Sequence, residues 1–306
     1  MKTTKMINVG SAAQVTFLGP FGATFSHMAY DCLSRAYGSP SVAADHSNFV
    51  AASSNEEVTE KAVSHGAYAA LAMETMAEGR VAEPLESFIR LIERYQDQEG
   101  VACPIHVIGS VRMRISFCLM VNPRSGMKAP ERIVGHAKAF GACREKVRAG
   151  GFQQLSVPSN GEAARLVAQD PAFIDAAALA PRLAASKYGL KITEESFEDR
   201  EAFTTFFLLG PRVHPVVTGA SNRALVIFRL SHRPGSLVRA LASLAAFEFN
   251  LVQIHSAYSG NGAYDFAIEL DVPGERVASF GKAIRSFSGC VERHICFGPF
   301  EVRSDL

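Results

Sequence analysis

Short apolar runs alternate with segments of helical periodicity along the first 210 residues. The apolar runs have the length and the branched or aromatic content of buried strands, and they predict strands at 14–18, 68–73, 203–209 and two within 105–121. The other segments predict helices at 26–37, 55–65, 137–149, 160–168 and 176–188. Ser54 or Asn55 provides an N-cap for the second of these helices. This alternation favours α/β layers around a largely parallel sheet.

A stretch with several prolines and glycines, residues 210–222, separates this pattern from a different one. Beyond it the pattern predicts strand, helix, strand, strand, helix and strand at 223–230, 235–247, 251–259, 263–272, 275–287 and 291–297. Asn261-Gly262 between the two central strands is a hairpin signal. The order βαββαβ is that of a ferredoxin-like domain. We therefore predict two domains, 1–210 and 220–306.

Composition narrows the class of protein. The 306 residues are 48% hydrophobic, which is enough to build two cores and excludes a largely disordered chain. Lys and Arg (31) balance Asp and Glu (30), which argues against a large basic surface for nucleic acid. We find no apolar run of about 18 residues, which predicts no membrane-spanning helix. The first residues also lack the continuous apolar stretch of a signal peptide.

Candidate cofactor chemistry is sparse in the sequence. The six cysteines form no CxxC pair, and the nine histidines show no HExxH-type spacing, so neither a metal site nor a disulfide framework is predicted. Gly19 and Gly22 do not complete a GxGxxG motif, so no nucleotide cofactor is implied. These observations favour a cytoplasmic protein with reduced thiols and without a cofactor.

Several short motifs occur in a definite order. They are Phe17-Leu18-Gly19-Pro20, Thr24-Phe25-Ser26, Met73-Glu74, Gly161-Glu162-Ala163-Ala164 and Phe203-Thr204-Thr205-Phe206. In this order and spacing the chain resembles the prephenate dehydratase family across about 14–300. The segments 233–238 and 249–254 resemble an ACT domain, a small-molecule sensor that usually pairs sheets across a dimer. The resemblance implies a two-lobed, periplasmic-binding-protein-like catalytic domain, a C-terminal ACT domain, and a dimer or tetramer.

The family converts prephenate to phenylpyruvate with loss of CO2 and water, and formation of the aromatic ring drives the reaction. By this resemblance, Thr204 is the proton donor to the leaving hydroxyl. A small anionic cyclic carboxylate is expected to bind at Thr24, Phe25, Ser26, Glu74, Thr75, Met76, Gly79, Arg80, His136, Thr205 and Phe206. An amino-acid effector of the ACT domain is expected at Gly235, Ser236, Leu237, Val238, Ile254, His255 and Ser256.

The chain departs from the family pattern at polar contact positions. Thr205 stands where the family has an arginine that holds a carboxylate, and 74–76 reads Glu-Thr-Met in place of Glu-Asn-Ser. His255 lies in a segment that retains only the serine of the family's Glu-Ser-Arg-Pro. We hypothesise that Arg80 supplies a substitute cation. Because framework glycines and apolar runs remain, the pattern favours a cleft reshaped for a related ligand.

Two alternatives to prephenate turnover stay open from the sequence. One is a repurposed lyase or decarboxylase acting on another cyclic or aromatic carboxylate or thioester in specialised metabolism. The other is a non-catalytic small-molecule sensor that retains the cleft for binding alone.

Overall fold

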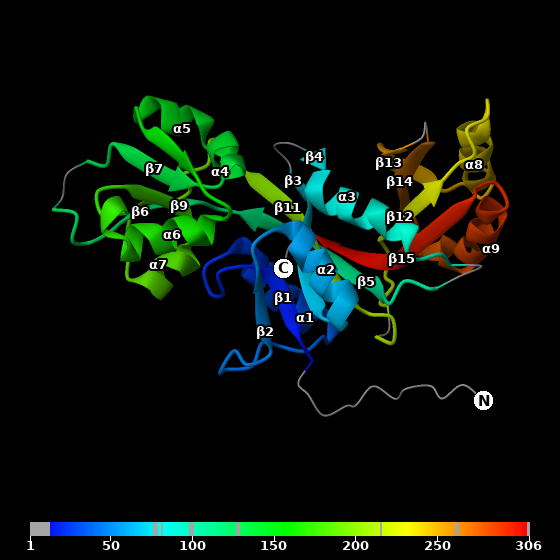
Figure 1. Ribbon diagram of the computed structural model, residues 1–306, viewed down its shortest axis with the longest axis horizontal. Coiled ribbons are helices and arrows are strands. Elements are labelled where there is room, and N and C mark those ends of the chain that lie inside the picture. Colours follow the sequence, from blue (N-terminus) through cyan, green and yellow to red (C-terminus); the bar gives the residue numbers. More distant parts are fainter. Residues whose placement is uncertain are drawn as a thin grey trace.

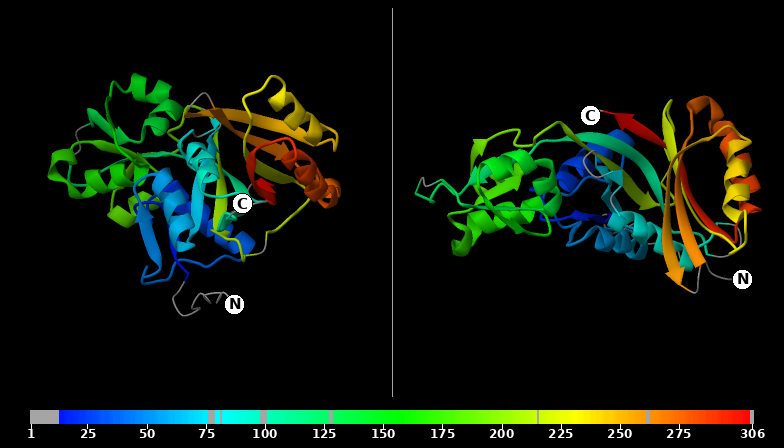
Figure 2. Two further views of the ribbon diagram at one scale, coloured as in Figure 1. Left: turned by 45° about the vertical axis from the view of Figure 1, so that its right-hand side comes forward. Right: turned by 90° about the horizontal axis from the view of Figure 1, so that it is seen from above.

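The computed structural model of the protein describes residues 13–75, 79–80, 82–97, 101–126, 129–214, 216–260 and 263–304. Its elements form three groups that lie in a row along the longest axis (Figure 1). We name them the central lobe (13–115 and 202–211), the outer lobe (118–194) and the C-terminal module (222–304). The view from above in Figure 2 shows the same row, with the central lobe in the middle.

The central lobe is a mixed sheet with helices on both faces. Strand β1 is parallel to β2 and β3, whereas β11 lies antiparallel between β3 and β5, and β4 pairs with β3. Helix α1 packs on one face of the sheet, and α2 and α3 pack on the other. The bounds are β1 (Val15–Leu18), α1 (Phe25–Tyr37), β2 (Phe49–Ala52), α2 (Asn55–His65), β3 (Tyr68–Thr75), β4 (Gly79–Arg80), α3 (Ala82–Arg90), η1 (Leu91–Glu93), β5 (Ile105–Ile115) and β11 (Ala202–Pro211).

The outer lobe is a smaller sheet of order β10-β6-β9-β7-β8. The chain enters it after β5 and returns from it before β11, so two segments cross between the lobes. Phe117 donates its N–H to a carboxylate oxygen of Glu198 at 2.9 Å and thereby joins these crossing segments. The bounds are β6 (Cys118–Val121), β7 (Arg132–Gly135), α4 (Ala137–Ala142), α5 (Arg144–Ala149), β8 (Gln153–Ser156), α6 (Asn160–Gln169), η2 (Pro171–Phe173), β9 (Ala177–Ala180), α7 (Arg182–Tyr188) and β10 (Lys191–Glu194).

The C-terminal module has the predicted βαββαβ order, with strands arranged β13-β14-β12-β15 and helices α8 and α9 on one face. The last strand continues beyond the module: Val302, Arg303 and Ser304 pair in parallel with β5 of the central lobe. One continuous sheet therefore runs through both groups. The bounds are β12 (Asn222–Arg229), α8 (Ser236–Ala245), β13 (Asn250–Gly260), β14 (Ala263–Asp271), η3 (Gly274–Arg276), α9 (Val277–Ser288) and β15 (Arg293–Ser304).

Three predictions of local structure were wrong. The segment 176–188 is a fully buried strand, β9, followed by helix α7, because Pro181 separates the two elements and the alanines fit between β6 and β7. The segment 137–149 is two short helices that meet at Cys143. The sheets are mixed rather than largely parallel, because the chain crosses between lobes and returns as the antiparallel strand β11. The hairpin signal Asn261-Gly262 lies outside the described residues.

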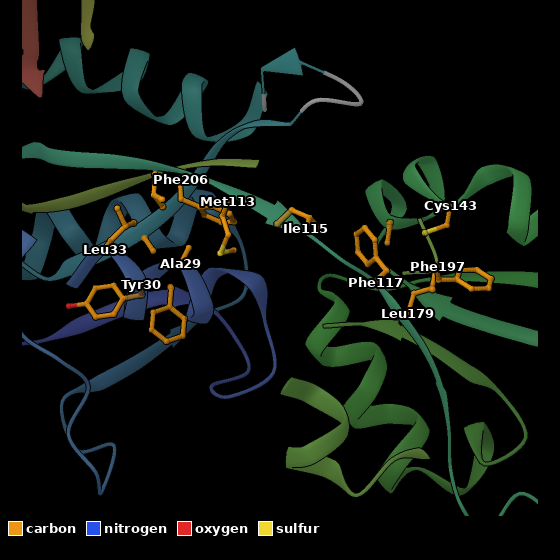
Figure 3. Close-up of a cluster of buried hydrophobic side chains, with 14 of the residues drawn as sticks. Ala29, Tyr30, Leu33, Met113, Ile115, Phe117, Cys143, Leu179, Phe197 and Phe206 are labelled. Carbon is orange, nitrogen blue, oxygen red and sulfur yellow. The ribbon is translucent and has the colours of Figure 1, made fainter. Parts of the chain in front are cut away.

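An apolar cluster joins the two lobes. Figure 3 shows Leu33 and Phe206 in the central lobe and Leu179 in the outer lobe, with Ile115 and Phe117 lying between them. These residues are buried, so water is removed from the junction and the lobes are held against one another. Within the described ranges, no helix combines the length and apolarity needed to span a membrane.

Candidate active site

A cavity of about 650 Å³ lies between the central and outer lobes, and we name it the cleft. Its walls come from the first turns of α1, α2, α4 and α6, from β3 and β11, and from the segment that crosses between the lobes. A cavity of this size between two α/β lobes is a typical place for a small ligand.

Helices α1 and α6 open onto the cleft from opposite lobes. Thr24 caps α1: its hydroxyl accepts the N–H of His27 at 3.2 Å and donates to the carbonyl of Leu18 at 2.9 Å. Ser159 caps α6 by accepting the N–H of Glu162 at 3.1 Å. The first turn of a helix presents N–H groups without acceptors in the helix, together with a partial positive charge. The cleft is therefore suited to anions.

The N-terminus of α2 differs because a carboxylate of the protein already occupies it. Glu83, at the start of α3, accepts the N–H of Glu56 at 3.2 Å and the side-chain amide of Asn55 at 3.3 Å. Ser54 caps the same helix by accepting the N–H of Glu57. This part of the cleft wall is thus internally neutralised, which leaves α1 and α6 as the anion-facing ends.

The two lobes touch directly beside the cleft. The Ser159 hydroxyl donates to the carbonyl of Gly19 at 2.8 Å, from the outer lobe to the central lobe. Gly161 sits at the same contact, where an added Cβ would lie 2.8 Å from the carbonyl oxygen of Ala23 and 2.7 Å from Thr24. Only glycine permits this approach, so the spacing of the lobes depends on residue 161.

Thr204, the predicted proton donor, lines the cleft and is almost fully buried. It lies in β11 directly opposite Thr75 of β3. The hydroxyl oxygen of Thr75 is buried and has no hydrogen-bond partner among the residues that the structure describes. Two neighbouring hydroxyls therefore face a shielded space, which suits donation of a hydrogen bond to a ligand oxygen.

Aromatic side chains from both lobes form the apolar part of the wall. Phe25 and Phe117 meet edge to face with ring centroids 5.2 Å apart, and Phe203 and Phe206 line the cleft from β11. Lys138, in the first turn of α4, also lines it and is a side-chain cation. The cleft thus combines an apolar surface for a ring with groups that attract negative charge.

His27 is buried in the first turn of α1, and its ring lies 5.3 Å from that of Phe17 and 4.3 Å from that of Phe21. Burial lowers the pKa of His27, and nearby Asp31 only partly opposes this effect. A lowered pKa keeps this imidazole neutral at neutral pH. His27 therefore contributes packing rather than charge at this end of the cleft.

Glu74 and Thr205 do not face the cleft, which corrects the expectation that they contact the substrate there. Both line a second cavity of about 470 Å³ on the opposite side of the sheet. The reason is the alternation of side chains along a strand, which sends Thr204 and Thr205 to opposite faces of β11. The family arginine position therefore belongs to the second cavity in this chain.

The structure places most of the remaining predicted substrate residues together. Those that line the cleft are Thr24, Phe25, Ser26, Thr75, His136, Thr204 and Phe206. Met76 lies outside the described residues; Gly79 and Arg80 are described only as the backbone of β4, opposite Glu74 and Thr75. The side chain of Arg80 lies outside the described part, so its role as a substitute cation stays a hypothesis.

The predicted effector residues lie in two places on the C-terminal module. Gly235, Ser236, Leu237 and Val238 begin helix α8, and Ile254, His255 and Ser256 lie in strand β13. Neither of the two cavities is lined by any of these seven residues.

Sequence reasoning missed several residues of the cleft wall, including Ser53, Glu83, Lys138, Ser159 and Asn160. Ser159 had a usable signal, since serine two residues before Gly161 and directly before a helical segment predicts an N-cap. Glu83 had none, because its contact with the start of α2 joins residues 27 positions apart. Among the described residues, no three His, Cys, Asp or Glu side chains lie close enough together to hold a metal ion.

Comparison with known proteins gives consistent results. Residues 15–213 match the sequence profile described as prephenate dehydratase. A prephenate dehydratase from Mycolicibacterium vanbaalenii is 30% identical over 268 residues, which cover 84% of this chain and 81% of that protein. Arogenate dehydratase/prephenate dehydratase 2 from Arabidopsis thaliana is 30% identical over 154 residues, covering 50% of this chain. The chain spans 40% of that plant protein and 60–65% of two further relatives.

Solved structures show the same fold. A prephenate dehydratase from Arthrobacter aurescens, in complex with L-Phe, gives a TM-score of 0.75 at 24% identity and covers 95% of this chain and 90% of that one. GqqA, described as a novel type of quorum-quenching acylase, gives 0.71 at 20% identity, with 95% and 98% covered. At these identities the likeness concerns the fold alone, and the fold is shared by proteins with different described activities.

Proposed function

This chain belongs to the prephenate dehydratase family, and from that premise we propose that it is a dehydratase-type lyase acting on prephenate. The observation that carries the proposal is the position of Thr204 in the cleft. Its side chain lies in a shielded space with aromatic walls, onto which the N-termini of α1 and α6 open. A cyclic dianion with a hydroxyl to be removed matches each of these features.

The cleft residues divide into holding and reacting groups. The first turns of α1 and α6, from opposite lobes, together with Lys138, hold carboxylates across the gap. The aromatic rings of Phe25 and Phe117 lie against the substrate ring. Thr204 then directs its hydroxyl toward the leaving oxygen, with the hydroxyl of Thr75 beside it.

The reaction balances without a cofactor. The bond between the ring carbon and its carboxylate breaks and releases CO2, and its electron pair enters the ring. The carbon–oxygen bond on the opposite ring carbon breaks with its electron pair on oxygen, which takes up a proton through Thr204 and leaves as water. Solvent returns a proton to Thr204. One prephenate and one proton thus give phenylpyruvate, CO2 and water.

Turnover of prephenate by variants of Thr204 tests the proposal. Thr204→Val keeps the shape of the side chain but removes the donor, so we expect kcat to fall by about 100- to 1000-fold. Thr204→Ser keeps the hydroxyl, and its kcat should stay within about tenfold of the parent protein. Phenylpyruvate formation is followed by its absorbance, and circular dichroism checks that both variants are folded.

The same assay separates the proposal from its rivals. If the parent protein turns over arogenate but not prephenate, the reaction class holds and the substrate assignment is wrong. If it turns over neither, and calorimetry shows tight binding of another metabolite, the protein is a sensor. If Thr204→Val and Thr204→Ser had the same kcat, the hydroxyl of Thr204 would not take part in the reaction.

We also propose that the C-terminal module is an ACT domain which takes part in amino-acid binding and assembly as a dimer or tetramer. Strand β13 is at the end of the strand order, so its outer edge has no partner strand among the described residues. Its side chains Ile254 and Tyr258 are 42% and 65% exposed, and Tyr264 of β14 is 46% exposed. An unpaired strand with exposed apolar groups favours pairing with a second copy.

Sedimentation velocity tests the assembly. Ile254→Lys places a charge on this edge, and we expect it to shift the protein toward the monomer. Val213→Lys is the matched control, because Val213 is 90% exposed in the segment before β12. A parent protein that is monomeric at micromolar concentration would contradict the proposal.

A further inference from the structure

The second cavity lies on the face of β11 that is turned away from the cleft. Thr205 and Phe207 of β11 line it from the central lobe, and Arg223 of β12 and Glu269 of β14 line it from the C-terminal module. Val302, in the part of β15 that joins β5, lines it between them. The cavity is therefore bounded by both groups, at the place where their sheets merge.

Charges of both signs line this cavity in equal number among the described residues. The cations are Arg112 and Arg223, and the anions are Glu74 and Glu269. Asp271 lies outside the lining, 4.0 Å from Arg223. A simple anion bound there would face the two glutamates, and a simple cation would face the two arginines. The balanced lining therefore disfavours both. A ligand that carries both charges is complementary to it.

Arg223 has unused hydrogen-bonding capacity. Its Nε is 3.9 Å from a carboxylate oxygen of Glu269 and 4.0 Å from one of Asp271, both too long for hydrogen bonds. Its Nη1 is buried and has no hydrogen-bond partner among the residues that the structure describes. A buried guanidinium N–H without an acceptor is unfavourable, and a ligand carboxylate would satisfy it.

The second arginine is held by an aromatic ring. The guanidinium carbon of Arg112 lies 4.6 Å from the ring centre of Phe203, and Arg112 is directly opposite Thr205 in the ladder between β5 and β11. A planar guanidinium stacked on a ring keeps its orientation, so little freedom is lost when it binds a carboxylate.

The remaining lining is apolar and roomy. Phe203, Phe207, Val252 and Val302 supply the apolar surface. Position 205 adds space, because threonine stands where the family pattern has the much longer arginine. An arginine side chain at this position would extend into the cavity from β11. The substitution seen in this chain therefore opens a pocket rather than merely removing a charge.

We propose that the second cavity binds a free α-amino acid with an apolar side chain. The carboxylate is held by Arg223 and Arg112, the ammonium by Glu269 and Glu74, and the side chain lies against Phe207. This site is separate from the α8–β13 residues expected to bind an effector, and it does not depend on the reaction in the cleft. Adjacent residues of β11 face the two cavities, so a single strand lies between them.

Single tryptophans can report on each site, since the chain has none of its own. Ser304→Trp places a reporter at the exposed rim of the second cavity, Phe25→Trp places one in the cleft, and Val238→Trp places one at the start of α8. L-Phenylalanine is the probe. We expect a saturable change in fluorescence for the reporter at 304, whether or not the reporter at 238 also responds.

Calorimetry with matched probes and variants tests the chemistry. Phenylpropionate lacks the ammonium and phenethylamine lacks the carboxylate, so each should bind at least about tenfold more weakly than L-phenylalanine. Arg223→Gln should weaken L-phenylalanine by a similar factor, whereas Arg285→Gln, on the exposed side of α9, should not. Thr205→Arg should abolish binding, because the longer side chain would occupy the cavity. This second variant still tests the proposal if Arg223→Gln fails to fold.

Several outcomes would overturn the proposal. One is a response confined to the reporter at 238 or at 25. Another is unchanged binding in the folded Thr205→Arg protein. A third is the absence of saturable binding of L-phenylalanine, L-leucine and L-methionine at millimolar concentration. None of these results depends on whether prephenate is turned over.

Discussion

The two cavities on either side of β11 use different chemistry to recognise charge. The cleft presents helix N-termini, hydroxyls and Lys138, so backbone N–H groups are among the sources of its attraction for anions. The second cavity is lined by arginine and glutamate side chains in balance. Alternate residues of a single strand thus face two different environments. The residues that face one cavity do not indicate the chemistry of the other.

The cavities also differ in how their walls are joined. The cleft is closed by close packing of the two lobes at Gly161 and by the hydrogen bond from Ser159 to Gly19. The second cavity is bounded by the C-terminal module. The module joins the central lobe through the pairing of β15 with β5, through buried aromatic contacts such as Phe207 against Phe300, and through the ion pair of Arg229 with Glu93 of η1. The two sites should therefore respond to different substitutions.

The largest expected effect comes from removing Arg229, which pairs with Glu93 across this junction and with Asp265 inside the module. Arg229→Met leaves the carboxylate of Asp265 buried without its bidentate partner, so we expect the free energy of unfolding to fall by about 3–5 kcal/mol. Urea denaturation measures the change. Arg94→Gln is the control, because its pair with Glu60 is about half exposed, and its removal should change stability by less than about 1 kcal/mol.

If the cavities are held independently, folded Arg229→Met protein retains its KM for prephenate while the response of a reporter at Ser304 to L-phenylalanine weakens. Loss of both together would show that the module also supports the cleft.

A smaller effect is expected from the junction at the cleft. Gly161→Ala forces a Cβ against the carbonyl of Ala23, so the lobes must separate, and kcat/KM for prephenate should fall by about 100-fold. Gly281→Ala, in helix α9, would bring the new Cβ only to 3.7 Å from the end of the Arg285 side chain, so it should leave kcat/KM unchanged and raise the melting temperature slightly. Unchanged activity of Gly161→Ala would show that the spacing of the lobes is adjustable.

The smallest effect concerns the source of anion recognition. If backbone N–H groups dominate in the cleft, Lys138→Gln should raise KM for prephenate only about three- to tenfold and leave kcat within about twofold. Steady-state kinetics at constant ionic strength measure both. A rise in KM beyond about 100-fold would mean that side-chain charge dominates there too, and the distinction between the cavities would disappear.

Much of the fold was predictable from local patterns. Strands with strong apolar content, such as β3 and β11, and helices with a serine or threonine cap, such as α1 and α2, were found within a few residues. The segment 176–188 was not, because an alanine run satisfies helical spacing and a buried strand equally well. Its burial in the sheet between β6 and β7 decided the outcome.

The site was predictable where motifs carry it and not where distant contacts build it. The motif around Thr204 led to the cleft, and the alternation of strand residues explains why Thr205 does not reach it. The second cavity had no signal in the sequence, since its lining comes from β3, β5 and β11 of the central lobe and from β12, β13, β14 and β15 of the module. Their meeting depends on how the module packs. Residues as far apart as Arg112 and Arg223 come to line one cavity because whole sheets pack together.

The parallel pairing of 302–304 with 110–112 bears on how the chain folds as it is synthesised. About 190 residues separate the two strands, so β5 leaves the ribosome long before its neighbour exists. Until then one side of β5 is an open edge, able to pair with another chain. A protein cut after β11 would keep that edge permanently. The C-terminal module therefore covers the open edge of β5. Truncated proteins that contain the central lobe without the module should aggregate.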